Sequence, residues 1–154
     1  MVVEVEVEPR DGLEKLRRAL AALPERQRKM GELMDRLGVR GVVAIHRTMM
    51  MGGRQLIVPP FSGAWPPWSE RYAATLPGGA KMLRRTQMLF GSITHVYDQT
   101  SVAMGTNLIY GRTHQWGDAA RNIPQRAFVG LAQDDIEAME KMILQWSEEV
   151  VSRG

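Results

Sequence analysis

In the stretch Ser92-Ile-Thr-His-Val-Tyr-Asp-Gln-Thr-Ser-Val-Ala-Met-Gly105, two short runs lie on either side of an expected turn. Residues 92–97 and 101–105 carry the β-branched, aromatic and apolar side chains that favour extended backbone. The polar Asp98-Gln-Thr100 between them is typical of a turn. We therefore expect a β-hairpin at this point.

Two helices are expected after the hairpin. Residues 108–116 fit a brief helix, and residues 117–127 fit a loop. Residues 133–151 place apolar side chains at helical spacing, and the acidic residues of the first turn suit the positive end of a helix dipole. This last segment predicts a strongly amphipathic helix.

One strand and further helices are expected before the hairpin. Valines alternate with glutamates over residues 2–8, which is the period of a half-buried strand. Because charges on the outward face protect a sheet edge, we place this strand at the edge, where it can also pair with a neighbouring subunit. An amphipathic helix is expected from Asp11 to Pro24, a second from Pro24 to about Met51, and a short one over residues 81–90.

A long loop is expected over residues 52–80, which are rich in glycine, proline and isolated aromatic residues. Loops of this length in compact domains are usually functional or mobile. Exposed tryptophans are costly for a monomer, so the aromatic residues either fold back on the core or dock on a partner. The candidates are Phe61, Trp65 and Trp68.

Length and composition limit the class of protein. The 154 residues suit a single domain over 1–154, and the lack of cysteine excludes disulfides and thiolate metal sites. No apolar run approaches the about 20 residues that span a bilayer, and the acidic start lacks the basic region of a signal peptide. We expect a protein that is soluble and is not exported by that route.

Charge is unevenly distributed along the chain. Residues 10–54 carry 11 basic and five acidic side chains, whereas residues 131–154 carry two basic and six acidic ones. A basic middle with acidic ends suits head-to-tail contacts between copies, or a surface that faces DNA. Basic helix faces also commonly just meet solvent. The candidate DNA-facing residues are Arg17, Arg18, Arg26, Arg28 and Lys29.

Catalytic motifs are not found in the sequence. His46, His95 and His114 are the only histidines, and none forms a His-x-x-x-His pair that would hold zinc. No nucleophile elbow, phosphate-binding glycine loop or His-Glu-x-x-His motif occurs. We therefore expect no catalytic residues, no metal and no cofactor.

The residue choice in Tyr110-Gly-Arg-Thr-His-Gln-Trp-Gly117 and Asn122-Ile-Pro-Gln-Arg-Ala-Phe128 is typical of protein interfaces, where aromatic residues and arginine dominate the binding energy. Candidate contact residues are Tyr110, His114, Gln115, Trp116, Pro124, Arg126 and Phe128. The alternative is that Tyr110, Trp116 and Phe128 instead close the domain core.

These two segments, together with Gly105-Thr-Asn-Leu-Ile-Tyr110 and Leu83-Arg-Arg-Thr-Gln-Met-Leu-Phe-Gly-Ser-Ile93, resemble the phage virion morphogenesis family, the Mu-like tail-completion proteins. Gln87 stands where the family usually has glycine, and Ala127 where a second proline is common. Ala132 stands where the family tends to have serine, so capping of the helix that follows is expected from Gln133 or Asp134.

The resemblance implies an α+β domain in which long helices pack on a small antiparallel sheet. It also implies a structural role in completing the tail or joining it to the head. The expected partners are further copies in a ring oligomer and other tail or connector proteins, with genomic DNA passing through the lumen. The expected location is the tail or neck of the virion, and the host cytoplasm during assembly. The alternative is a nucleic-acid-binding module that uses the basic helical region.

Overall fold

The computed structural model describes residues 2–4, 24–53 and 63–152. Several expectations fall outside these ranges: the strand beyond Glu4, the helix before Pro24, and the residues Arg17, Arg18 and Phe61. Arg26 and Arg28 lie in a described helix, but their side chains are outside the description.

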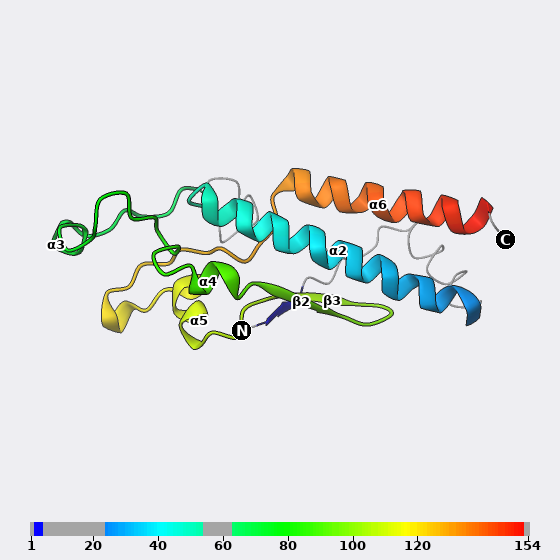
Figure 1. Cartoon of the computed structure of the whole chain (residues 1–154), viewed down its shortest axis with the longest axis horizontal. Coiled ribbons are helices and arrows are strands. Elements are labelled where there is room, and N and C mark those ends of the chain that lie inside the picture. Colours follow the sequence, from blue (N-terminus) through cyan, green and yellow to red (C-terminus); the bar gives the residue numbers. More distant parts are fainter. Residues whose placement is uncertain (1, 5–23, 54–62, 153–154) are drawn as a thin grey trace.

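Two long helices run side by side along the longest axis of the molecule (Figure 1). They are α2 (Pro24–Met50) and α6 (Gln133–Ser152), as the apolar periodicity predicts. Leu33, Leu37 and Ile45 of α2 and Trp146 of α6 are buried in one core, so burial of their apolar stripes stabilises the pair.

Three strands form an antiparallel sheet on the other side of α2 (Figure 1). They are β1 (Val2–Glu4), β2 (Thr94–Tyr97) and β3 (Val102–Gly105), in the order β1-β3-β2. The expected hairpin is therefore confirmed, with Val96 opposite Ala103, and β1 lies at a sheet edge as expected. Within the described residues, five α-helices, one short 3-10 helix and this sheet make the fold α+β, as expected.

The hairpin turn is held by a single carboxylate. Asp98 accepts hydrogen bonds from the backbone N–H groups of Thr100 at 2.6 Å and Ser101 at 2.7 Å. These bonds favour the ionised form and lower the pKa of Asp98 to about 2. The turn therefore keeps its charge, and its geometry, over the whole neutral and mildly acidic range.

Two glycines bring α2 close to the sheet. A methyl group on Gly38 would collide with the ring of His95, and one on Gly41 would collide with the sulfur of Met104. Both neighbours belong to the sheet, so the absence of side chains at these helix positions sets the distance between the layers. His95 also bonds to the Asp35 carboxylate of α2 at 2.7 Å.

The segment before the hairpin differs from the expected helix over residues 81–90. Only α4 (Met88–Gly91) is helical there. Leu83 and Gln87 have φ values of 56° and 58°, in the left-handed region that a right-handed helix cannot contain. Gln87 occupies the position where glycine, which enters this region easily, is usual in the family that the sequence resembles.

The start of α6 also differs from expectation. Neither Gln133 nor Asp134 caps the helix; instead the Asp135 carboxylate accepts from the backbone N–H of Ala132 at 3.4 Å. The same buried carboxylate accepts from Arg47 at 2.7 Å and from Arg40 at 3.1 Å, both on α2. Two arginines thus fix the orientation of the side chain that caps the neighbouring helix.

The expected long loop holds one turn of helix, α3 (Glu70–Ala73). We call residues 63–80 the arm, because they extend beyond the C-terminal end of α2 at one end of the molecule (Figure 1). α5 (Ile109–Trp116), expected as a brief helix, and the short 3-10 helix η1 (Ala119–Arg121) lie nearer the sheet. The C-terminal end of α6 lies at the opposite end of the molecule from the arm (Figure 1).

Candidate functional site

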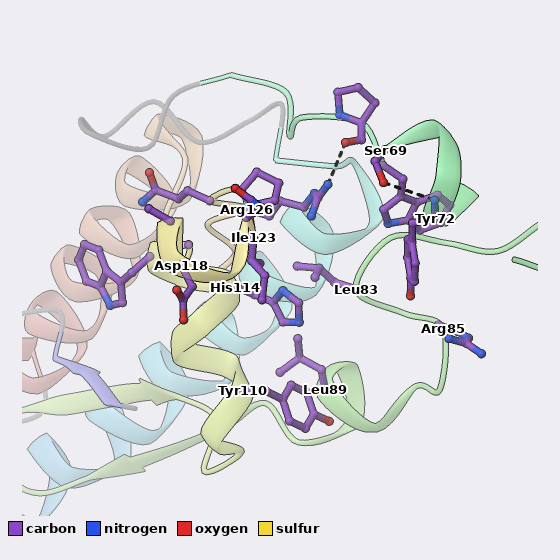
Figure 2. A pocket seen from close by; sticks show the side chains of 18 of the residues that line it. Ser69, Tyr72, Leu83, Arg85, Leu89, Tyr110, His114, Asp118, Ile123 and Arg126 are labelled. Atoms are coloured by element: carbon purple, nitrogen blue, oxygen red, sulfur yellow. Dashed lines mark hydrogen bonds between the residues drawn. The ribbon is translucent and has the colours of Figure 1, made fainter. Parts of the chain in front are cut away.

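An open cleft of about 1240 Å³, called here the contact cleft, lies between the arm and the segment from α5 to Arg126 (Figure 2). Figure 2 shows Ser69 and Tyr72 on the arm side, and Tyr110 and His114 on the α5 side. The aromatic and basic side chains that line the cleft are Trp68, Tyr72, Lys81, Arg85, Tyr110, His114, Trp116 and Arg126.

The base of the arm is bound to the body through backbone carbonyl groups. The indole N–H of Trp65 donates to the carbonyl oxygen of Ala127 at 2.7 Å. In the reverse direction, the Arg126 guanidinium donates to the carbonyl oxygens of Pro66 at 3.0 Å and Pro67 at 2.9 Å. Of the two roles left open for Trp65, the structure therefore shows folding back on the core.

Close packing adds to these hydrogen bonds. The Trp65 indole occupies the space that a side chain at Gly53 would need, and Gly53 has a φ of 80°. Trp68 is half-buried and meets Tyr72 edge to face, with the ring centroids 6.2 Å apart. Trp68 therefore lies within the cleft wall, beside an exposed tyrosine of the arm.

The floor behind the cleft is fixed by Gln115. Its side-chain oxygen accepts from the backbone N–H groups of Phe128 at 3.0 Å and Val129 at 2.9 Å. Its side-chain nitrogen donates to the Val129 carbonyl at 2.9 Å. Gln115 and Phe128 are both buried, which differs from their expected role as contact residues, because Gln115 supplies the hydrogen bonds that this segment of backbone needs.

The other expected contact residues border the cleft. Tyr110 and Trp116 are 40% and 53% exposed, so they do not close the core as Phe128 does. Pro124 and Arg126 line the same cleft, with Pro124 exposed and Arg126 largely buried. The structure thus brings together five of the seven residues: Tyr110, His114, Trp116, Pro124 and Arg126.

The surroundings of His114 in the cleft disfavour the charged form of its imidazole. Its Nδ1 atom is buried and has no hydrogen-bond partner among the described residues. Burial lowers the pKa of His114 below its ordinary value of 6.5, and the nearby positive charge of Arg126 lowers it further. The imidazole is consequently neutral at pH 7.

The cleft is electropositive. Burial lowers the pKa of the Arg126 guanidinium from its usual value, but an arginine keeps its charge in proteins, and its partners here are neutral carbonyls. Lys81 and Arg85 add two exposed positive charges. Asp118, the one carboxylate that lines the cleft among the described residues, is bound by Arg121 at 2.7 Å.

Sequence reasoning missed the contribution of Tyr72, Lys81 and Arg85 to this site. They precede α5 by about 30 residues in the chain, and no spacing rule links them to it. They reach the cleft because Trp65 and Arg126 attach the base of the arm to the body. Because every residue has a backbone carbonyl, the sequence does not show which residue accepts such a hydrogen bond.

The remaining histidines take part in packing. His46 bonds to the Phe90 carbonyl at 2.8 Å and stacks on its ring at 4.1 Å. His95 bonds to the carboxylate of Asp35, 60 residues away in the chain. This pair lies between α2 and the sheet and not in the cleft. Within residues 2–4, 24–53 and 63–152, no group of three histidine, aspartate or glutamate side chains is placed to hold a metal ion.

The expected DNA-facing stripe is only partly visible. Lys29 is exposed on α2, and it is the one candidate among the five whose side chain the structure describes. Arg40 and Arg47, further along α2, are paired with acidic residues of α6. These two arginines therefore contribute to packing between helices.

Comparison with known proteins identifies a family. The model of the phage virion morphogenesis family matches residues 11–148. Searches of curated proteins and of solved structures found no match. In the described part of the chain, no helix has both the length and the apolar composition to cross a membrane. Since the family match extends over nearly the whole chain, the protein belongs to the phage virion morphogenesis family.

Proposed function

We propose that this protein completes the phage tail or joins the tail to the head, and that it does so as a ring oligomer. It acts by binding other virion components, without making or breaking bonds. The observation that carries the proposal is the contact cleft, which in a virion morphogenesis protein combines exposed aromatic side chains with a projecting arm.

The cleft has the composition and the size of a protein-binding surface. Tyrosine, tryptophan and arginine are enriched at the energetic centres of interfaces, and all three line this cleft. Pockets for small molecules usually measure about 300 to 1,000 Å³. The cleft, at about 1240 Å³ and open to solvent, exceeds that range. A polypeptide segment is therefore a better match than a metabolite.

A ring follows if the contact joins two different surfaces. Such heterologous contacts repeat around an axis and close when the rotation between neighbours allows it. The lumen would then pass the genome, and the protein would lie in the tail or neck after assembly in the host cytoplasm. The arm supports this arrangement because it projects at one end of the molecule, where a neighbouring copy could contact it (Figure 1).

Disruption of the gene in the phage genome tests the role. We expect the lysate to contain DNA-filled heads and separate tails, seen by electron microscopy, and expression of the intact gene from a plasmid to restore joined particles. Normal yields of infectious virions without the gene would refute the proposal. So would a lysate that lacks heads altogether.

A point variant tests whether the cleft is needed for this role. Trp116→Ala is expected to fold, as judged by circular dichroism, and yet fail to restore joined particles. Tyr97→Ala is the matched control, because Tyr97 is also an exposed aromatic residue but lies on the hairpin. If both variants restored joined particles equally well, the cleft would not be needed for the function.

The second candidate is a nucleic-acid-binding module. The specific observation in its favour is the basic helical region over residues 10–54, with Lys29 exposed on α2. Binding of this kind weakens steeply with salt, because phosphate contacts release counterions. Fluorescence anisotropy with labelled duplex DNA at low and high salt tests it, and no binding at low salt would exclude it.

A further inference from the structure

Among the described residues, nothing pairs with the mixed surface on the C-terminal half of α6. Leu144, Glu148 and Val151 are separated by four and three residues, so they share one face of the helix. We call these three residues the acidic stripe. All are exposed, with Leu144 at 52% and Val151 at 59%. Trp146 and Val150 are buried on the opposite side, where the helix packs into the core.

The acidic stripe and the contact cleft have complementary chemistry. The stripe offers two apolar side chains beside a carboxylate, and Glu149 adds a second exposed carboxylate next to it. The cleft offers apolar and aromatic walls with three positive charges, from Lys81, Arg85 and Arg126. Apolar burial with oppositely charged rims is the usual pattern of a specific protein contact.

One molecule cannot make this contact with itself. The arm and the C-terminal end of α6 lie at opposite ends of the longest axis (Figure 1). α6 has 20 residues, so it is about 30 Å long, and its far end points away from the cleft. The occupant of the cleft must therefore come from another molecule.

We infer that the contact cleft of one copy receives the acidic stripe of a second copy. The inference rests on the proposed function, because a contact between two different surfaces at opposite ends of the molecule generates the repeated head-to-tail arrangement of a ring. Glu148 lies toward Arg85 and Lys81 at the cleft rim, and Leu144 and Val151 pack against the aromatic walls. Figure 2 shows Arg85 at the edge of the cleft, away from α5.

A second copy fits better than DNA does. The phosphate backbone would satisfy the basic groups, but it would leave the apolar walls formed by Leu83 and Leu89, beside Tyr110, without a partner. The acidic stripe satisfies both kinds of group. The described residues also leave Leu144 and Val151 exposed, so covering them adds hydrophobic stabilisation to the charge pairing.

Cross-linking tests the geometry, and the chain has no cysteine of its own to interfere. The double variant Arg85→Cys with Glu148→Cys is treated with a short bismaleimide, both as purified full-length protein over a range of concentrations and in virions. We expect a ladder of covalent multimers, because each copy links to two neighbours. Arg85→Cys alone and Glu148→Cys alone should give no ladder.

The matched control is Arg36→Cys with Glu148→Cys, since Arg36 is an exposed arginine of α2 that does not line the cleft. It should give no ladder. A ladder of the same strength from this control would overturn the inference. So would a dimer without higher multimers from the cleft variant, which would indicate a symmetric contact.

Charge reversal tests the chemistry. Arg85→Glu and Glu148→Arg should each weaken self-association about tenfold or more in sedimentation velocity, and the two changes in one chain should restore it. Glu137→Arg, at the other end of α6, is the control and should leave self-association unchanged. Failure of the double variant to recover, with both single variants folded, would contradict the pairing.

These experiments separate the inference from the proposed function. If disruption of the gene leaves unjoined heads and tails while the double-cysteine variant forms no ladder in virions, the function stands and the inference is wrong. If the cysteine at position 85 instead links to a different virion protein, the cleft binds that protein and not a second copy.

Discussion

The Gln115 side chain makes the hydrogen bonds that a neighbouring strand would otherwise make to the backbone of Phe128 and Val129. Three of its hydrogen bonds satisfy the buried backbone of Phe128 and Val129, which no strand pairs. We predict that Gln115→Leu lowers the free energy of unfolding by about 2 to 4 kcal/mol, because the buried N–H and carbonyl groups are left without partners. Urea denaturation measures the change.

The control for this prediction is Gln145→Leu, at an exposed position of α6. It should shift the free energy of unfolding by less than about 0.5 kcal/mol. Similar losses in both variants would show that the glutamine-to-leucine change itself, and not the three hydrogen bonds, causes the effect.

His114 makes the stability of the fold depend on pH. Its folded-state pKa lies below the ordinary value of 6.5, so between the two values the unfolded chain binds more protons. Stability therefore rises with pH in this window, and the contribution is lost as pH falls from 6.5 toward the folded pKa. We predict a shallower decline for His114→Gln than for the unaltered protein, measured by urea denaturation at several pH values. Parallel curves would contradict the prediction.

At the scale of secondary-structure elements, α2 and the sheet are held close by missing side chains. We predict that Gly38→Ala lowers the free energy of unfolding by about 1 to 3 kcal/mol, because the new methyl group collides with the His95 ring, which Asp35 holds in place. Thermal and urea denaturation measure the change.

Gly31 provides a control of opposite sign on the same helix. A methyl group added there meets no atom within 4 Å, so Gly31→Ala should gain up to about 1 kcal/mol from better helix propensity. A loss of stability in both variants would show that the collision with His95 is not the cause.

The arm can be loosened without unfolding the body. Trp65→Phe keeps an aromatic ring but removes the hydrogen bond to the Ala127 carbonyl. We predict faster amide hydrogen exchange over residues 63–80, while α2 and α6 stay protected. Trp68→Phe is the control, because the indole N–H of Trp68 makes no hydrogen bond among those identified in the described residues. Uniform exchange across the whole chain in Trp65→Phe would instead indicate global destabilisation.

The elements that sequence predicts correctly are those whose pattern is local. Apolar periodicity is sufficient for α2, α5 and α6, and the Asp98 turn is sufficient for the hairpin. Residues 81–87 were predicted wrongly because the left-handed backbone at Leu83 and Gln87 is imposed by the surrounding structure, against the preference of both residues.

The site was harder to predict because it depends on distant contacts. Asp135 reaches back to the Ala132 N–H as the third residue of a capping box does, and the arginines that hold it lie 88 to 95 residues away, a contact that sequence spacing does not reveal. Five of the seven contact candidates border the cleft, and they were selected because aromatic and arginine side chains are enriched at interfaces. Only the three-dimensional structure distinguishes these five residues from Gln115 and Phe128, which are buried.

At the scale of the whole molecule, the contact cleft and the C-terminal segment carry opposite net charge. The cleft is basic, and residues 131–154 carry six acidic and two basic side chains. We predict that raising salt from about 0.1 M to about 1 M, which shortens the screening length from about 10 Å to about 3 Å, weakens self-association without abolishing it. Sedimentation velocity measures this. Stronger association at high salt would show that apolar burial alone governs the contact.

The joint between the arm and the body has an evolutionary consequence. Trp65 and Arg126 donate hydrogen bonds to backbone carbonyl oxygens, which every amino acid has. Mutations that change what the tip of the arm displays therefore leave the attachment chemistry intact. The side chains of the arm can therefore diverge between related phages while its attachment to the rest of the molecule is kept.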